Sequence, residues 1–288
     1  MTGPRADPPL RRPATARPRS DRPEDVPPPT AAELDAVERQ LATLPRFSGA
    51  SVAEAPDADS ILVSLPGRGP AQNFVACMRW SEAETTARLA EVEARMRGER
   101  EWPALMVAEG VSLPASLPAR LAAQGWMELE AERVMWTRRA PVVPHLDPQT
   151  RLEGATRRSA AEYESLERAV FGLPEGRSQE RIEGLIAAVD GGELRAFLVR
   201  LHGAPVAVAR VALAESVAGI YAVGVAPDRR RMGFGALVTA IATRSALATG
   251  NRLAWLSVAE SNEAAMQLYR SLGYQPTFRW SRWLTPPG

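Results

Sequence analysis

The sequence lacks lysine altogether and has only one cysteine and two histidines among its 288 residues. A single cysteine excludes an internal disulfide and a cysteine metal cluster, and Cys77 lies in an apolar run that predicts a buried thiol. The two histidines, His145 and His202, lie far apart, and neither has a second ligand at metal-binding spacing. We therefore expect no metal site.

All of the positive charge comes from arginine, yet the formal net charge is only +1. A nearly neutral chain offers no large field for nucleic acid or an anionic membrane, so we expect neither as a partner. An arginine-rich surface recognises phosphates, but the same bias is typical of a GC-rich bacterial genome. No apolar run approaches the length of a membrane span and no signal peptide is evident, which predicts a soluble, cytoplasmic protein.

The length predicts two domains, and a proline-rich break supports this division. Residues 1–30 are rich in proline and arginine and have almost no large apolar side chains, so we predict a disordered arm. The first domain is expected over residues 31–140. Prolines in 141–149 exclude a helix or a central strand, which makes this segment a linker. The second domain is expected over residues 150–288.

Both predicted domains mix helix and strand patterns, and the second alternates more regularly. In the first domain, helices are predicted at 31–44, from Ser81 onward and at 117–124, and strands at 60–65, 74–80, 105–108 and 126–138. In the second, helices are predicted at 159–171, 178–189, 233–249 and 262–272, and strands at 194–201, 205–213, 218–225, 253–258 and 274–283. This order predicts an α/β fold in which a mixed, mostly antiparallel sheet is flanked by helices.

The clearest functional signal lies where a predicted strand meets the longest predicted helix. Gly233 and Gly235 stand at the start of this helix, where unpaired amides and the helix dipole bind anions. Glycine lets a pyrophosphate approach the backbone, and Arg230 and Arg231 add positive charge nearby. The segment is not a P-loop, because it lacks the Gly-Lys-Ser/Thr ending. It is not the dinucleotide fingerprint either, because Val238 replaces the third glycine.

This segment resembles the acetyl-CoA-binding motif of the GNAT (GCN5-related N-acetyltransferase) superfamily. The resemblance is carried by Val223-x-Val225, by Arg230-x-x-Gly233-x-Gly235 and by the downstream pattern Ser257-Val258-x-x-x-Asn262-x-x-Ala265-x-x-x-Tyr269-x-x-x-Gly273-Tyr274. It implies that acetyl-CoA is the co-substrate, with its pantetheine arm in a gap between two strands and its pyrophosphate on the turn. The implied cofactor-binding residues are Val223, Gly224, Val225, Arg230, Arg231, Met232, Gly233, Phe234, Gly235, Ala236 and Asn262.

The resemblance also implies catalytic roles. The Tyr269 hydroxyl would protonate the leaving thiolate, the amide of Val223 would polarise the thioester carbonyl, and Asn262 would hydrogen-bond the cofactor arm or the adjacent backbone. Helical spacing alone favours a buried core aromatic for Tyr269. Asn262 has the alternative of an N-cap for the last helix, and it can hold both roles together. The strand before the turn has no glutamate where many members carry a general base. No base is assigned; Tyr221 or a water relay are alternatives.

The acceptor site is less constrained. Phe171, Tyr221 and Trp280 are candidate lining residues, which would suit an amine beside an apolar or aromatic group, and each also fits plain packing. The predicted reaction is direct attack by a primary amine on acetyl-CoA in a ternary complex. The amine belongs to a small molecule, amino acid or peptide. The alternative is a non-catalytic acyl-CoA-binding sensor or partner module. Homodimer formation stays open.

The first half looks like a degenerate copy of the second. Leu121 to Trp126 stands where Tyr269 to Tyr274 stands, with a helix, a glycine stop, an aromatic residue and a strand in each. Leu121 replaces the tyrosine, and no Arg-x-x-Gly-x-Gly precedes it. The chain therefore resembles tandem GNAT proteins, in which one half is catalytic and the other structural. Two GNAT-like domains are expected.

Overall fold

The computed structural model describes residues 26–55, 57–145 and 147–285. In the first half of the chain, the helices are α1 (Ala31–Thr43), η2 (Leu44–Ser48), α2 (Thr85–Gly98) and α3 (Leu117–Ala123). The strands of this half are β1 (Ser51–Glu54), β2 (Ile61–Ser64), β3 (Phe74–Ala76), β4 (Ala104–Ala108) and β5 (Met127–Thr137). Most of the predicted arm, residues 1–25, lies outside the described residues.

The second half has the more regular alternation that its sequence predicts. Its helices are α4 (Ala160–Phe171), η3 (Glu175–Arg177), α5 (Ser178–Asp190), η4 (Pro227–Arg229), α6 (Phe234–Ala248) and α7 (Glu263–Ser271). Its strands are β6 (Thr150–Gly154), β7 (Leu194–Leu201), β8 (Ala204–Leu213), β9 (Val217–Val225), β10 (Leu253–Ala259) and β11 (Gln275–Leu284). None of the described helices is both long and apolar enough to cross a membrane.

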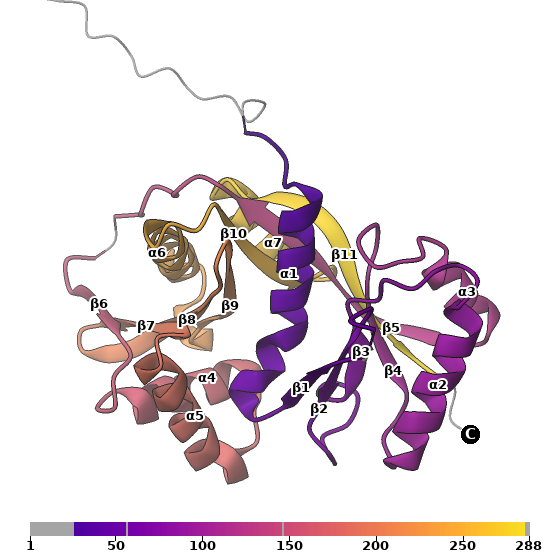
Figure 1. Ribbon diagram of the computed structural model, residues 1–288. Coiled ribbons are helices and arrows are strands. Elements are labelled where there is room, and N and C mark those ends of the chain that lie inside the picture. Colours follow the sequence, from indigo (N-terminus) through magenta and orange to yellow (C-terminus); the bar gives the residue numbers. More distant parts are fainter. Residues whose placement is uncertain (1–25, 56, 146, 286–288) are drawn as a thin grey trace, which may run out of the picture.

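The strands of both halves form one twisted sheet, in the order β1-β2-β3-β4-β11-β5-β10-β9-β8-β7-β6 (Figure 1). Neighbouring strands are antiparallel except in the pairs β3–β4 and β9–β10. The predicted α/β class with a mixed, mostly antiparallel sheet is confirmed. The sheet is continuous rather than divided between the halves, and the domain limits at residues 140 and 150 stay a prediction.

The two halves are joined because they exchange their last strands. β5 ends the first half, yet it lies between β10 and β11 of the second half. β11 ends the second half, yet it pairs with β4 of the first. Each half thus completes the sheet of the other.

Local sequence explains where the elements differ from expectation. β3 stops at Ala76 instead of Trp80, because Cys77 takes a left-handed backbone conformation with φ of 56° that breaks the strand. α2 begins at Thr85, after a turn in which the Ser81 hydroxyl donates to the Glu84 carboxylate at 2.6 Å. β1 and β6 were not predicted, because both are short and mostly exposed edge strands without a clear apolar alternation.

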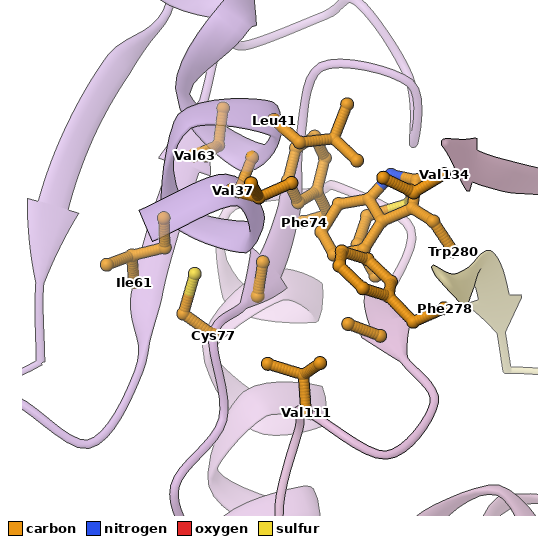
Figure 2. Packing of buried hydrophobic residues seen from close by; sticks show 14 of the residues in the cluster. Val37, Leu41, Ile61, Val63, Phe74, Cys77, Val111, Val134, Phe278 and Trp280 are labelled. Carbon is orange, nitrogen blue, oxygen red and sulfur yellow. The ribbon is translucent and has the colours of Figure 1, made fainter. Parts of the chain in front are cut away.

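Helices cover both faces of the sheet. Side chains alternate along β10, so Leu253 and Trp255 join the core cluster under α1, whereas Ala254, Leu256 and Val258 join the cluster under α6 and α7. We call these two sides the α1 face and the α6 face. Helix α1 crosses the α1 face where the halves meet (Figure 1). Figure 2 shows the cluster beneath it, with Val37 and Leu41 of α1 packed near Phe74, Val134 and Trp280.

Candidate active site

Strands β9 and β10 separate toward their C-terminal ends. Their parallel pairing runs from Val217 with Leu253 to Ile220 with Leu256. Beyond this point, the last residues of β10 pair with β5 on the other side. On β9, the amide of Ala226 donates to the carbonyl of Val206 at 2.9 Å, so the backbone groups of the preceding Val225 point away from β8. The end of β9 therefore presents a backbone edge toward the gap beside β10.

A bulge redirects β9 at the start of this gap. Ala222 has a φ of 51°, and the register with β8 shifts between Val208 and Arg210, so that Ala222 and Val223 together face Ala209. A bulge bends its strand, and this bend in β9 is consistent with the separation of β9 from β10. It lies directly before the Val223-x-Val225 motif.

The turn after β9 leads into an uncapped helix. Arg231 and Gly233 have φ values of 63° and 85°, and Gly233 is the N-cap residue of α6. Gly233 offers no side chain to the first-turn amides, and that turn has no acidic residue. The amides of Phe234, Gly235 and Ala236 therefore have neither an intrahelical partner nor a side-chain cap. By contrast, α1 begins with a capping box made by Thr30 and Glu33.

Charge around this turn matches an anion. Arg229, Arg230 and Arg231 are exposed, and Arg229 pairs with Asp228 at 3.2 Å. Met232 is exposed as well. The free amides, the helix dipole and the arginines together fit a diphosphate group held against the backbone.

Two glycines of the motif have packing roles that the sequence did not indicate. A Cβ on Gly235 would lie 3.3 Å from Leu268 Cδ2, so this glycine lets α6 approach α7. A Cβ on Gly224 would lie 2.8 Å from Val170 Cγ1 and 3.2 Å from the Phe171 ring. Gly224 thus lets the end of α4 pack onto β9.

Tyr269 is the buried residue of α7, with 7% of its surface exposed. It shares one apolar cluster with Val223, Val225 and Phe234, so the structure brings these parts of the motif together on the α6 face. Its hydroxyl has no hydrogen-bond partner among the described residues, and burial raises the pKa of Tyr269 to about 12. The hydroxyl is therefore protonated at neutral pH and free to donate.

Asn262 caps α7. Its side-chain oxygen accepts a hydrogen bond from the amide of Ala265 at 3.1 Å. The N-cap alternative for Asn262 is confirmed, and the exposed side chain keeps its amide group for a further contact.

The three candidate acceptor residues lie in different surroundings. Phe171 is 44% exposed and packs beside Gly224 at the end of β9. Tyr221 is stacked on Phe47 of η2, with ring centroids 6.4 Å apart. Trp280 is buried in the cluster of the α1 face beside Val134 (Figure 2), which agrees with its packing alternative.

A buried polar group under α4 was not identified from the sequence. Arg210 of β8 forms an ion pair with Glu167 and lies 5.4 Å from the centre of the Tyr163 ring. Tyr221 faces Arg210 across the β8–β9 pair. The hydroxyls of Tyr163 and Tyr221 are buried and interact with the Arg210 guanidinium. No local motif signals this group, because its members come from three separate elements.

The first half repeats the left-handed residue but closes the gap. Cys77 has a φ of 56° where Ala222 has 51°, and β3 and β4 pair only around Val75 and Leu105 before they separate. There the amide of Leu113 donates to the carbonyl of Met78 at 2.8 Å. The chain itself therefore occupies the edge that the second half leaves open. Across the described part of the chain, no group of three or more His, Cys, Asp or Glu residues is placed to hold a metal ion.

Comparisons with known proteins agree with this geometry. Residues 160–274 match the model of the Acetyltransferase (GNAT) family, and no curated protein matches the chain. A GCN5-related N-acetyltransferase from Kribbella flavida has the same fold with a TM-score of 0.68 and 22% identity, over 90% of this chain and 96% of that one.

Two further solved structures share the fold. One is a GCN5-related N-acetyltransferase from Sphaerobacter thermophilus, with a TM-score of 0.63 and 17% identity over 90% of this chain and 95% of that one. The other is a tandem GNAT protein from the clavulanic acid biosynthesis pathway, with a TM-score of 0.60 and 18% identity over 80% and 79%. Residues 160–274 thus match the GNAT family, and they lie within a fold that solved GNAT proteins share over most of the chain.

Proposed function

We propose that the protein is an N-acetyltransferase that transfers the acetyl group of acetyl-CoA to a primary amine by direct attack in a ternary complex. The observation that carries this proposal is the open edge of β9 beside the uncapped N-terminus of α6. The backbone of Val223 and Val225 would hold the pantetheine arm, and the amides from Arg231 to Ala236 would hold the pyrophosphate. An extended arm and a diphosphate need these two surfaces side by side.

The chemistry divides between positioning and proton transfer. The amine nitrogen attacks the thioester carbonyl carbon, the C–N bond forms, and the C–S bond breaks. Tyr269 would give its proton to the leaving thiolate, because its hydroxyl is protonated and without a partner among the described residues. An amide near Val223 would stabilise the developing oxyanion.

The acceptor would lie on the α1 face of the gap, opposite α6 and α7. Phe171 and Tyr221 give this region an aromatic character. An amine attached to an apolar or aromatic group, on a small molecule, amino acid or peptide, would suit it.

The first test is calorimetric titration of acetyl-CoA into the wild type and Gly233→Trp. The tryptophan should block the pyrophosphate turn and abolish saturable binding. Gly203→Trp is a matched control, since Gly203 has a φ of 84° against 85° for Gly233 but lies in the β7–β8 hairpin with open space around it.

Binding must then be linked to transfer. Free thiol should appear when wild type, acetyl-CoA and a panel of primary amines are mixed. Binding that survives in Gly233→Trp would contradict the proposed site. Saturable binding without thiol release from any amine would instead favour a non-catalytic acyl-CoA-binding module.

A further inference from the structure

The strand exchange places a carboxylate of the first half next to the gap of the second. Glu132 of β5 pairs with Ala259 of β10 on one side and with Trp280 of β11 on the other. β10 is the strand that separates from β9 to form the gap. Glu132 is therefore one strand away from the proposed acetyl group, although it precedes the GNAT domain in sequence.

The side chain of Glu132 points to the face where the acceptor would lie. Directly paired residues share a face of the sheet, and Trp280 is buried under α1. Tyr221 is on the same face, because it alternates with Gly219, whose missing Cβ would meet the Trp255 ring. Ala259 of β10 lies between Glu132 and the gap beside β9, and its side chain is only a methyl group. The space next to the Glu132 carboxyl is therefore not filled by a larger side chain from β10.

The surroundings of Glu132 suit a group that exchanges a proton. Elsewhere in the described residues, the buried carboxylates Glu33, Glu38, Glu164 and Glu167 each form an ion pair with an arginine, but the half-buried Glu132 forms none. The Ser257 hydroxyl lies against its carboxyl, and the charged groups facing it are Glu130 of β5 and Arg282 of β11. Burial raises the pKa of Glu132, which Ser257 and Arg282 oppose and Glu130 reinforces.

We propose that Glu132, supplied by the first half of the chain, accepts the proton of the attacking amine in the active site of the second half. This inference rests on the proposed acetyl transfer. As the C–N bond forms and the C–S bond breaks, the amine proton moves to the Glu132 carboxylate, directly or through the Ser257 hydroxyl. Tyr269 protonates the thiolate and regains a proton from solvent, and Glu132 releases its proton to solvent, so the amine loses one proton, the thiol gains one and both residues return to their starting states.

The second half has no general base of its own at the expected place. β9 carries no glutamate before the turn, and the exchange of last strands brings one in from β5 instead. The first half then contributes a reacting group as well as structural support.

The test compares Glu132→Gln with the wild type. The probes are acetyl-CoA and a panel of primary amines that includes 2-phenylethylamine, and kinetics are followed with the amine that the wild type acetylates fastest. We expect kcat/KM for the amine to fall about 100-fold or more at pH 7, the usual size of a general-base contribution. The Kd for acetyl-CoA should stay within about twofold, which also shows that the variant is folded.

Two further variants sharpen the test. Glu132→Asp keeps a carboxylate on a side chain that is one methylene shorter. It should therefore retain at least about a tenth of the wild-type kcat/KM, far above Glu132→Gln, provided that the carboxylate still reaches the amine or Ser257. Glu130→Gln removes an exposed carboxylate that helps to raise the pKa of Glu132, so it should leave kcat/KM at pH 7 nearly unchanged and move the acid limb of the pH profile slightly lower. In the wild type, activity should fall as the pH drops through the raised pKa of Glu132, and this limb should be missing from Glu132→Gln.

The possible failures are distinct. Full activity of Glu132→Gln with an unchanged pH profile would overturn the role of Glu132 but leave acetyl transfer standing. A loss that Glu130→Gln shares equally would also overturn it. Absence of acetyl-CoA binding and of transfer by the wild type would overturn the proposed function itself.

Discussion

Trp255 donates its indole N–H to the side-chain oxygen of Gln40 at 2.7 Å, and both side chains are buried. The same Gln40 amide donates to the carbonyl of Ala212 at 2.9 Å. A single residue of α1 therefore satisfies polar groups on β10 and β8. The contact ties a helix of the first half to the sheet next to the proposed gap.

Replacing Gln40 should destabilise the whole molecule. Gln40→Met keeps the side-chain length but leaves the Trp255 indole N–H buried without a partner, at roughly 1–3 kcal/mol, whereas the Ala212 carbonyl keeps its place in the ladder opposite Gly219. We expect the free energy of unfolding in urea to fall by about 1–3 kcal/mol. Gln179→Met, on the exposed side of α5, should change it by less than about 0.5 kcal/mol. Equal effects of the two substitutions would contradict this role.

Gly219 should not tolerate a methyl group. A Cβ at this position would lie 2.5 Å from the Trp255 ring, which is fully buried and held by its bond to Gln40. Gly219→Ala should therefore lower the free energy of unfolding by about 1–3 kcal/mol. Gly98→Ala is the control, because nothing lies within 4 Å of its added methyl group, and it should be neutral or slightly stabilising. Thermal unfolding of both variants decides the matter.

Much of this architecture was accessible from the sequence, because local patterns determined it. Apolar periodicity predicts helix α6 and strand β9, and glycines mark the junction between them. Buried strands such as β4 read as apolar runs for the same reason. The motif then predicted that Val223, Val225, Phe234 and Tyr269 belong to one site, and the structure places all four in one cluster.

The long-range pairings were not accessible. Nothing in the local pattern of β5 distinguishes pairing with β10 from pairing with its own half, since strand order depends on contacts between residues far apart in the chain. For this reason Glu132 went unnoticed. Trp280 illustrates the converse, because an aromatic residue near the end of a strand fits a cleft and a core equally well until burial is known.

The ion pair between Glu33 and Arg138 should make stability depend on pH. Arg138 donates to both carboxylate oxygens at 2.8 Å, which lowers the pKa of Glu33 from 4.5 to about 2. A lowered pKa contributes stability above the unfolded value and loses it as the pH falls. The contribution is about 3 kcal/mol at pH 7 and about half of that at pH 3, since one pKa unit corresponds to about 1.4 kcal/mol.

This dependence is tested with Glu33→Gln. Urea unfolding should show a large difference between wild type and variant at pH 7 that shrinks as the pH is lowered toward 3. Glu54→Gln removes a carboxylate whose partner, Arg39, is exposed, and its effect should stay small throughout. A difference for Glu33→Gln that is constant from pH 7 to pH 3 would show that the ion pair is not its source.

The closed gap of the first half predicts one binding site per chain. The amide of Leu113 already donates a hydrogen bond to the carbonyl of Met78, which stands at the position that corresponds to Val223 in the second half. Calorimetric titration should therefore give a stoichiometry of one acetyl-CoA per chain, and Gly233→Trp should remove all of it. Two sites in the wild type, or one that survives in this variant, would show that the first half binds the co-substrate.

Substitution of the two neighbouring tyrosines Tyr269 and Tyr274 should distinguish a catalytic hydroxyl from a structural one. The two rings lie 6.1 Å apart and both are buried, but only Tyr274 has a hydrogen-bonded hydroxyl among the described residues, with Thr243 Oγ1 at 2.6 Å. Tyr269→Phe should therefore leave the free energy of unfolding nearly unchanged and lower kcat about 100-fold, because the thiolate loses its proton donor. Tyr274→Phe should lower stability by about 1 kcal/mol and leave kcat nearly unchanged.

The two measurements are made on the same preparations, so that each variant is the control for the other. Acetyl-CoA affinity should be retained in both, since neither hydroxyl is needed for the backbone contacts of β9. If Tyr269→Phe keeps the wild-type kcat, Tyr269 is a core residue only, and protonation of the thiolate must come from solvent. If it instead lowers stability as much as Tyr274→Phe does, its hydroxyl has a structural partner, which would contradict its availability as an acid.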